Sequence, residues 1–151
     1  MTDKKLSKED ITIVIDTREK RPLKFNKAKT VSGTLGEGDY SLLGHEKEIS
    51  IERKSLSDLL GSLGNSRKRF FQEILRLEKY SFAAIVVETD LSTIKKGNWV
   101  YGGIHPNSVI GSLQAISVRY GIQVFFCGNP KLTANYVEGL LFHYYKKVVP
   151  I

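Results

Sequence analysis

The sequence has 151 residues, of which 41% are hydrophobic and 26% are charged, and its formal net charge is +7. This length and balance predict one compact domain, and no apolar run approaches the roughly 20 residues that a membrane-spanning helix needs, so we expect no membrane partner. The single cysteine, Cys127, excludes a cysteine-built zinc site, and the positive charge favours an anionic partner such as nucleic acid.

The first half of the chain predicts strands. Residues 1–10 are polar and charged, and we interpret them as a flexible N-terminal tail that precedes a single domain over 11–149. The run ITIVID over 11–16 is almost continuously β-branched, which is typical of a strand buried on both faces. A second short strand could lie within 30–36. Two further strands, predicted to pair as a hairpin joined by the turn GHEKE, are 40–43 and 48–53.

The second half predicts an alternation of helices and strands. A short helix should begin after Ser55, because Ser-x-x-Asp over 55–58 has the form of a capping box. The elements predicted after it are a helix over 66–80, a strand over 82–88, a loop over 89–105, a helix over 107–120, a strand over 122–126 and a helix over 130–147. This order predicts an α/β fold in which a mixed central sheet is flanked by helices.

The last predicted helix carries more apolar residues than one narrow stripe can hold. They are Leu132, Tyr136, Val137, Leu140, Leu141, Tyr144 and Tyr145. The helix could be packed deeply in its own core, or it could form a subunit interface. We favour the interface, because so small a sheet has little room to cover every side of the helix.

Three residues of the predicted hairpin suggest chemistry on phosphates. Hydrolysis of a phosphodiester needs a divalent cation, carboxylates that hold it, and a positive charge near the attacking water. Asp39 lies on the first arm of the hairpin, and Glu52 and Lys54 lie two residues apart on the second arm, so their side chains share a face. The same residues also fit a charged surface hairpin with cross-strand ion pairs.

Other acidic residues could belong to the same site. Asp16 ends the first buried strand, where sites form in α/β sheets, although it could instead anchor the following turn. Arg18 and Glu19 come directly after it and could form a solvated ion pair. For Asp58 we favour a role in capping the helix over a catalytic role.

The segments IDTRE, GDYSLL, IERKSLSDLLGSL and SRKRFFQEILRL, in this order, resemble the nuclease domain of the XPF/Hef family. The family signature is Gly-Asp, a spacer, and Glu-Arg-Lys followed by a Ser and an Asp. It stands here as Gly38-Asp39 and Glu52-Arg53-Lys54-Ser55, with Asp58. The resemblance covers residues 11–147. It implies a restriction-endonuclease-like fold and endonucleolytic cleavage of branched or flapped DNA with Mg²⁺ or Mn²⁺.

The resemblance also implies roles for individual residues. Asp39 and Glu52 would bind the metal, with Asp16 as a further acidic member of the site. Lys54 would position or activate the attacking water, and Arg53 would contact phosphate or brace the site. Glu19 and Asp58 would support these residues. The family's helical Arg and Gln would fall on Arg67 or Arg69 and on Gln72.

The family acts as dimers through helices near the end of this domain, which agrees with the interface that we favour for the last helix; the dimer could be a homodimer or a heterodimer. The family's helix-hairpin-helix and helicase portions are not recognisable here, so we expect a stand-alone nuclease or an isolated domain. We expect it inside the cell, in the cytoplasm or nucleoid, or in the nucleus of a eukaryote.

Contact with DNA should be mainly electrostatic, and Arg18, Lys20 and Arg21 are candidates for it together with the Arg67–Arg69 cluster. Trp99 and Tyr101 could stack on an unpaired base or plug the edge of the sheet. Two alternatives stay open at this point. The chain could be a non-catalytic DNA-binding or scaffold subunit, or it could cleave RNA with the same chemistry.

Overall fold

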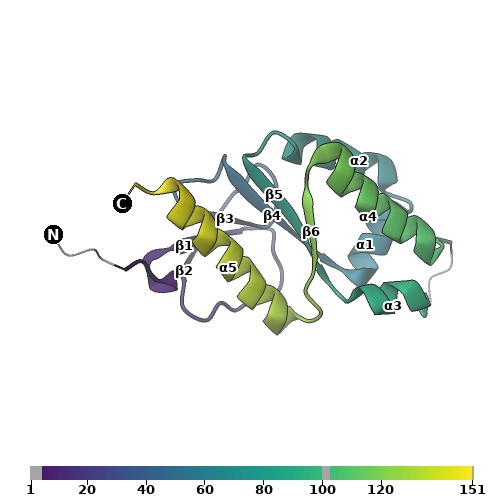
Figure 1. Ribbon diagram of the computed structural model, residues 1–151, viewed down its shortest axis with the longest axis horizontal. Coiled ribbons are helices and arrows are strands. Elements are labelled where there is room, and N and C mark those ends of the chain that lie inside the picture. Colours follow the sequence, from purple (N-terminus) through teal and green to yellow (C-terminus); the bar gives the residue numbers. More distant parts are fainter. Residues whose placement is uncertain (1–4, 100–102, 151) are drawn as a thin grey trace.

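The computed structural model describes residues 5–99 and 103–150, which fold around one six-stranded sheet (Figure 1). The strands, in the spatial order β2-β1-β3-β4-β5-β6, are β2 Lys29–Gly33, β1 Thr12–Asp16, β3 Tyr40–Leu42, β4 Ile49–Ser55, β5 Phe82–Glu88 and β6 Gln123–Phe126. Strand β3 runs antiparallel to β1 and β4, while the other neighbouring strands are parallel. The sheet is therefore mixed, and the predicted fold class is confirmed.

Within the described residues, five α-helices and one short 3-10 turn accompany the sheet. They are the turn Lys8–Asp10, α1 Leu56–Leu63, α2 Arg67–Leu77, α3 Leu91–Lys96, α4 Pro106–Tyr120 and α5 Pro130–Val148. Part of the tail predicted over 1–10 thus forms a turn, and residues 1–4 lie outside the described residues. None of the helices in the described ranges combines the length and the apolar character needed to cross a bilayer.

Helix α3 lies within the segment that the sequence predicts as a loop, so that prediction is wrong over Leu91–Lys96. Two local signals explain the helix. The Asp90 side chain accepts a hydrogen bond from the backbone N–H of Thr93 at 2.6 Å, and Gly97 ends the helix with φ of +65°. Trp99 is half-buried against the neighbouring core, whereas Tyr101 lies outside the described residues.

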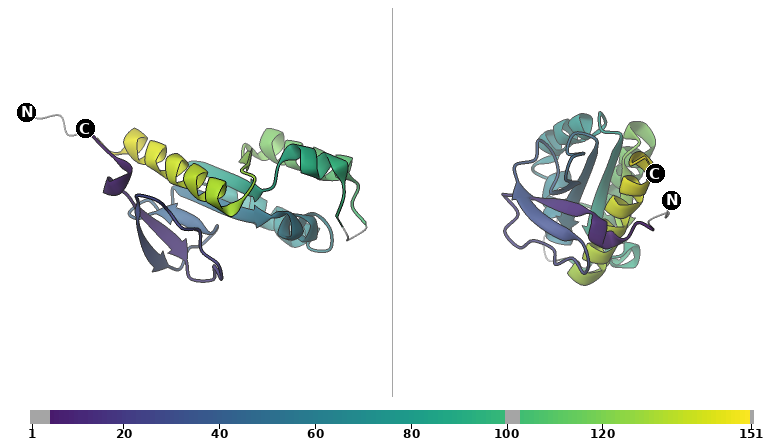
Figure 2. Two further views of the ribbon diagram at one scale, coloured as in Figure 1. Left: turned by 90° about the horizontal axis from the view of Figure 1, so that it is seen from below. Right: turned by 90° about the vertical axis from the view of Figure 1, so that its left-hand side faces the viewer.

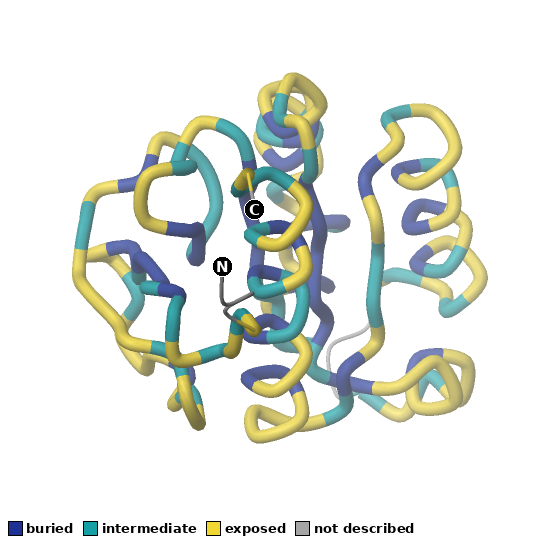
Figure 3. Tube along the Cα trace, turned by 60° about the vertical axis from the view of Figure 1, so that its left-hand side comes forward, coloured by how far each residue is buried: buried dark blue, intermediate teal, exposed yellow. Residues whose placement is uncertain are grey.

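The sheet separates two hydrophobic cores, and strand β5 contributes to both by the alternation of its side chains. Ala84 and Val86 face the core that contains α5, while Ile85 and Val87 face the core that contains α1, α2 and α4. Figure 2 shows the sheet and its helices from two further sides, and in Figure 3 the buried residues are concentrated along the central strands. Each residue of β4 must therefore point toward one core or the other.

The wide apolar face of α5 packs mostly against the protein's own sheet. Ala134, Val137 and Leu141 are buried in the first core, whereas Leu132 is 54% exposed and Tyr136 is 44% exposed. Packing within the protein's own core, one of the two alternatives that the sequence left open, therefore accounts for most of this face.

Candidate functional site

Three charged side chains meet at the carboxyl end of β4, on the face that α2 covers. The backbone N–H of Asp39 donates to the carbonyl of Ile51 at 2.8 Å, and the Asp39 carboxylate accepts from the backbone N–H of Arg53 at 2.8 Å. The Lys54 Nζ atom lies 3.7 Å from Glu52 Oε1. The structure thus brings together the Asp39, Glu52 and Lys54 side chains that the sequence singles out.

The approach of Asp39 to β4 depends on the glycine before it. Gly38 has φ of +79°, and a Cβ atom at this position would lie 2.1 Å from the Ser50 hydroxyl oxygen. Only glycine accepts both the left-handed backbone and the close contact. Lys54 is oriented by α2, since its Nζ atom lies 5.2 Å from the centre of the Phe70 ring.

The two carboxyl groups of this site are held in an unfavourable environment for negative charge. Burial raises the pKa of Asp39 to about 6, even though the N–H of Arg53 stabilises its charged form. Burial, followed by repulsion from Asp39 and Glu73, raises the pKa of Glu52 well above its usual range. Adjacent oxygen donors that repel each other in this way suit a divalent cation, which would offset their charge.

Glu73 is a member of this group that the sequence interpretation missed. Its carboxyl group contributes to the raised pKa of Glu52, and its negative charge also raises the pKa of Asp39. Glu73 lies three residues after Phe70 on α2, so the two side chains project from the same side of the helix. The three-residue spacing of Phe70 and Glu73 is visible in the sequence. It points to the site only once Phe70 is known to pack over Lys54.

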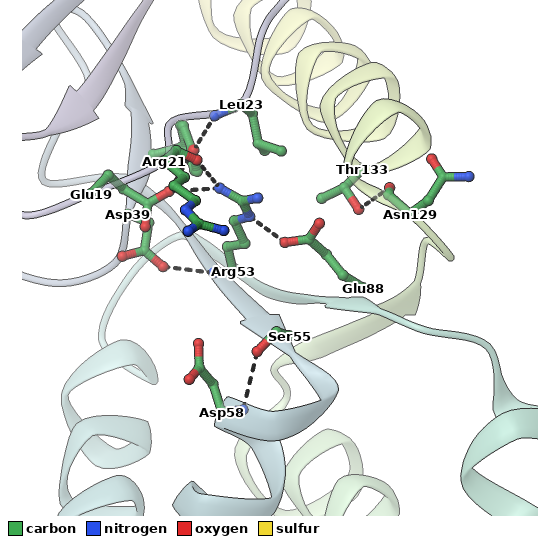
Figure 4. A network of polar contacts seen from close by, with 11 residues as sticks. Glu19, Arg21, Leu23, Asp39, Arg53, Ser55, Asp58, Glu88, Asn129 and Thr133 are labelled. Atoms are coloured by element: carbon green, nitrogen blue, oxygen red, sulfur yellow. Dashed lines mark hydrogen bonds and ion pairs between the residues drawn. The ribbon is translucent and has the colours of Figure 1, made fainter. Parts of the chain in front are cut away.

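Arg53 points to the opposite face of the sheet, where its charge is matched by two glutamates (Figure 4). Its guanidinium donates to Glu88, to Glu19 Oε2 at 3.1 Å and to the carbonyl of Arg21 at 2.6 Å. Glu19 also accepts from the Tyr40 hydroxyl at 2.6 Å. With its side chain only 15% exposed, Arg53 braces the strand end rather than offering its charge to a phosphate.

Glu88 is the second residue that the sequence interpretation missed. It ends strand β5 in the same way that Asp16 ends β1, and Ser55 of β4 is its register partner. A carboxylate at the end of a buried strand was a usable signal here. The structure assigns it to the ion pair with Arg53, with its side chain 8% exposed.

Asp16 is engaged by its own loop. Its Oδ2 atom accepts from the backbone N–H of Arg18 at 3.1 Å and from its Nε at 2.8 Å, and Oδ1 accepts from the N–H of Leu35 at 2.9 Å. Burial raises its pKa, but these hydrogen bonds outweigh burial, and the pKa lies below its usual value. The structure favours the turn-anchoring role over the metal-ligand role.

Two of the three predicted metal ligands fit a divalent cation. Within 5–99 and 103–150, no three His, Cys, Asp or Glu side chains are arranged to hold a metal ion by themselves. The set Asp16, Asp39 and Glu52 is therefore not formed. Asp39 and Glu52 fit a hard divalent cation whose remaining ligands are backbone or water oxygens.

Ser55 and Asp58 begin helix α1. The Ser55 hydroxyl accepts from the backbone N–H of Asp58 at 3.1 Å, which supports the capping role. The Asp58 carboxylate is exposed and lines a cleft of about 800 Å³ together with Lys20 and Arg21. Asp58 therefore borders the site without belonging to the Asp39–Glu52 pair.

The remaining basic candidates are dispersed. Arg67 on α2 donates to the Ser112 hydroxyl at 3.1 Å and stacks over the Phe71 ring at 4.9 Å, so it is engaged within the fold. Arg69 donates weakly to the Ser66 hydroxyl at 3.3 Å, and Gln72 is exposed on the same helix. Arg18 is held by Asp16 and by the carbonyl of Leu35.

Comparison with known proteins identifies the relatives of this site. The family model "ERCC4 domain" matches residues 15–140. The chain is 31% identical over 134 residues to the 3′-flap repair endonuclease Xpf of Saccharolobus solfataricus, covering 85% of this chain and 53% of that protein. It is 29% identical over 133 residues to a putative ATP-dependent RNA helicase of Methanocaldococcus jannaschii, covering 87% of this chain and 15% of that protein.

Solved structures agree with the sequence relatives. XPF from Aeropyrum pernix superposes with a TM-score of 0.73 at 23% identity, over 93% of this chain and 65% of that chain. Its complex with DNA superposes with a TM-score of 0.70 at 25% identity, over 93% and 68% of the two chains. The fold is therefore that of the XPF nuclease domain, and the sequence spans about half of the length, or less, of the two curated relatives named above.

Proposed function

Because this chain belongs to the ERCC4 domain family, as the match over residues 15–140 shows, we propose that it is a metal-dependent endonuclease that cleaves branched DNA. The observation that carries the proposal is the convergence of Asp39, Glu52 and Lys54 at the end of β4. The Saccharolobus solfataricus relative, which is named as a 3′-flap repair endonuclease, and the DNA complex of the Aeropyrum pernix neighbour support DNA as the substrate.

In this proposal each residue of the α2-covered face has one task. Asp39 and Glu52, as carboxylates, would hold Mg²⁺ or Mn²⁺, which would offset charge on the scissile phosphate and make water a better nucleophile. Lys54 positions the attacking water or stabilises the phosphate oxygens. The Phe70 ring and Glu52 keep the Lys54 ammonium beside the carboxylates.

The opposite face of β4 serves as a support. Arg53 ties the strand end to β5 through Glu88 and to the 17–28 loop through Glu19 and the Arg21 carbonyl. This network limits movement of the residues on either side of Arg53, which are Glu52 and Lys54. A displacement of a reacting group by about 1 Å can cost about 10²-fold in rate, so such a brace matters to catalysis.

We also propose that the protein dimerises at the edge strand β6. Phe126 at the end of β6 is 38% exposed and Leu91 is 47% exposed, and both line an apolar hollow with Ile110 and Val124. An exposed apolar edge of a sheet is a surface that proteins usually cover. Sedimentation of the wild type should give a dimer and Phe126→Asp a monomer; equal masses for the two would contradict this assignment.

The function is tested by incubating the protein with end-labelled DNA in which flap, fork, junction and linear duplex are compared. We expect cleavage near the branch with Mg²⁺ or Mn²⁺, little cleavage of the linear duplex, and none in EDTA. A matched RNA fork tests the RNA-cleaving alternative. Binding of forks without cleavage under every metal condition would contradict the proposal and favour a scaffold subunit.

A further inference from the structure

We propose that a cleft on the α5 side of the sheet binds a single-stranded arm of the DNA substrate, an inference that rests on the proposed function. Two hollows adjoin there. One of about 800 Å³ lies between the loop that contains Lys20 and the start of α1. The other, of about 410 Å³, lies between Lys24 and the start of α5. They share Arg21, Arg53 and Pro130, so they adjoin, and the two together are the proposed cleft.

The charge of this cleft is positive after its internal ion pairs are removed. Arg53 is shared by two carboxylates, Glu19 and Glu88, which leaves one negative charge, while Arg18 is balanced by Asp16. Asp58 adds a second negative charge, and the four cations that follow outnumber these two. The cations that line the cleft and have no ion pair with another described residue are Lys20, Arg21, Lys24 and Lys131. All four are exposed, so they can follow a phosphate backbone without first breaking a contact.

The start of α5 adds to this attraction. Pro130 occupies the first turn of a 19-residue helix, and the adjacent Asn129 side chain accepts from the N–H of Leu132. The positive end of the helix dipole therefore faces the cleft beside Lys131. Together with the unpaired cations, it favours an anionic strand over a neutral ligand.

The shape and lining of the cleft favour one strand over a duplex. Hollows of a few hundred Å³ accept molecules of nucleotide size, whereas a duplex can only lie across their mouth. The wall beside Lys24 is formed by Pro22, Leu23 and Pro130, which offer apolar surface to a sugar or an unpaired base. A positively charged groove that follows the backbone is one feature of sites that bind single strands, and the apolar wall here adds contact area.

The cleft begins where the proposed active site ends. Ser55 and Asp58 border its wider hollow, and Ser55 directly follows Lys54 in the chain. Figure 4 shows Asp58, Arg53 and Asp39 around this end of β4. A strand that leaves the scissile phosphate on the α2-covered face can therefore turn around the strand end and enter the cleft on the α5 side.

The test compares two double variants of equal charge change. Lys24→Ala/Lys131→Ala removes two cations of the cleft. Lys146→Ala/Lys147→Ala is the matched control, because these lysines lie at the other end of α5, about 24 Å from Lys131 at 1.5 Å per residue. Fluorescence anisotropy without divalent metal measures the affinity of each protein for a blunt duplex and for the same duplex with a 3′ or a 5′ single-stranded arm.

We expect the cleft variant to lose about tenfold in affinity for either the 3′-armed or the 5′-armed duplex. It should bind the blunt duplex as tightly as the control variant does. For the armed duplex, the slope of log affinity against log salt should fall by about 1.4, at about 0.7 for each lost contact with a single strand. Equal losses for armed and blunt DNA, or equal losses in the two variants, would overturn the inference. Cleavage by the wild type is measured separately. If the wild type is inactive but the cleft variant still shows the arm-specific loss of affinity, the proposed nuclease function is refuted while the proposed binding cleft stands.

Discussion

The two faces of β4 at its carboxyl end use charged residues in opposite ways. On the α2-covered face, Glu52 and Asp39 repel each other, and burial raises the pKa of both. On the α5 face, Arg53 lies between Glu19 and Glu88, and every charge has an opposite charge in contact. Alternation along one strand places these two environments one residue apart.

This difference supports the proposal that the α2-covered face carries the chemistry. A buried pair of like charges destabilises a fold, so its presence at the end of a conventional sheet needs a reason other than stability. The divalent cation of the proposed function would supply that reason on the α2-covered face. On the α5 face the charges serve the fold, because both carboxylates, Glu19 and Glu88, contact the guanidinium of Arg53.

The largest expected effect is on catalysis, from a change on the α2-covered face. Lys54→Met keeps the aliphatic stem beside Phe70 but removes the ammonium group, so single-turnover cleavage should fall by about 10²-fold or more. The thermal midpoint should stay near that of the wild type. A variant with wild-type cleavage would show that Lys54 has no part in the reaction.

A change on the α5 face should act first on stability. Arg53→Ala leaves Glu19 and Glu88 without their cation in a mostly buried position, which should cost about 3 kcal/mol of folding free energy. Urea denaturation measures this loss. Arg53→Lys is the matched control and should recover part of it; a fully stable Arg53→Ala protein would refute the bracing role.

The two faces should also differ in their response to pH. Asp39 has a folded pKa of about 6 against an ordinary value of 3.8, so its protonated form is favoured in the folded state. Its contribution to stability is present below about pH 4 and is lost as the pH rises through about 6. In EDTA the thermal midpoint should fall over this window, and Mn²⁺ should raise it more at high pH than at low pH.

Asp39→Asn provides the control for this pH effect. Without the Asp39 carboxyl group, the decrease between about pH 4 and about pH 6 should become smaller, and so should the gain from Mn²⁺ at high pH. An Asp39→Asn protein that follows the wild-type curve in both conditions would show that another group is responsible.

The smallest effect should come from the helix that follows the strand. Ser55→Ala removes the hydroxyl that accepts from the Asp58 N–H, and the loss of such a cap costs about 1 kcal/mol. Ser55→Asp keeps an acceptor and serves as the control. Chemical denaturation of the two variants should separate them, and equal stabilities would refute the capping role.

The sequence predicts the proposed catalytic face better than the supporting face. The spacing of Glu52 and Lys54 is enough to place them on one face, and the hairpin brings Asp39 to the same end. The partners of Arg53 come from β5 and from a loop far away in the chain, so no local pattern reveals them. The role of Asp16 depends on whether Arg18 folds back onto it, which is decided by side-chain conformation.

The difference between local patterns and packing contacts also explains the wrong or missing predictions elsewhere in the fold. Helix α3 is short, and the glycines and aromatic residues around its end favoured a loop prediction, although Asp90 and Gly97 mark its two ends. Glu73 could not be assigned to the site before the packing of α2 on β4 was known. Contacts that depend on how elements pack, rather than on the period within one element, are those that the sequence does not provide.

Glu52 and Glu88 allow the most direct test of the whole account, because the same residue type is placed near the ends of neighbouring strands on opposite faces. Single-turnover cleavage of a labelled fork with Mg²⁺ is measured for Glu52→Gln and for Glu88→Gln. The account predicts a loss of at least about 10²-fold for Glu52→Gln and a loss of no more than about tenfold for Glu88→Gln. Equal rates for the two variants would contradict the assignment of the chemistry to the face that α2 covers.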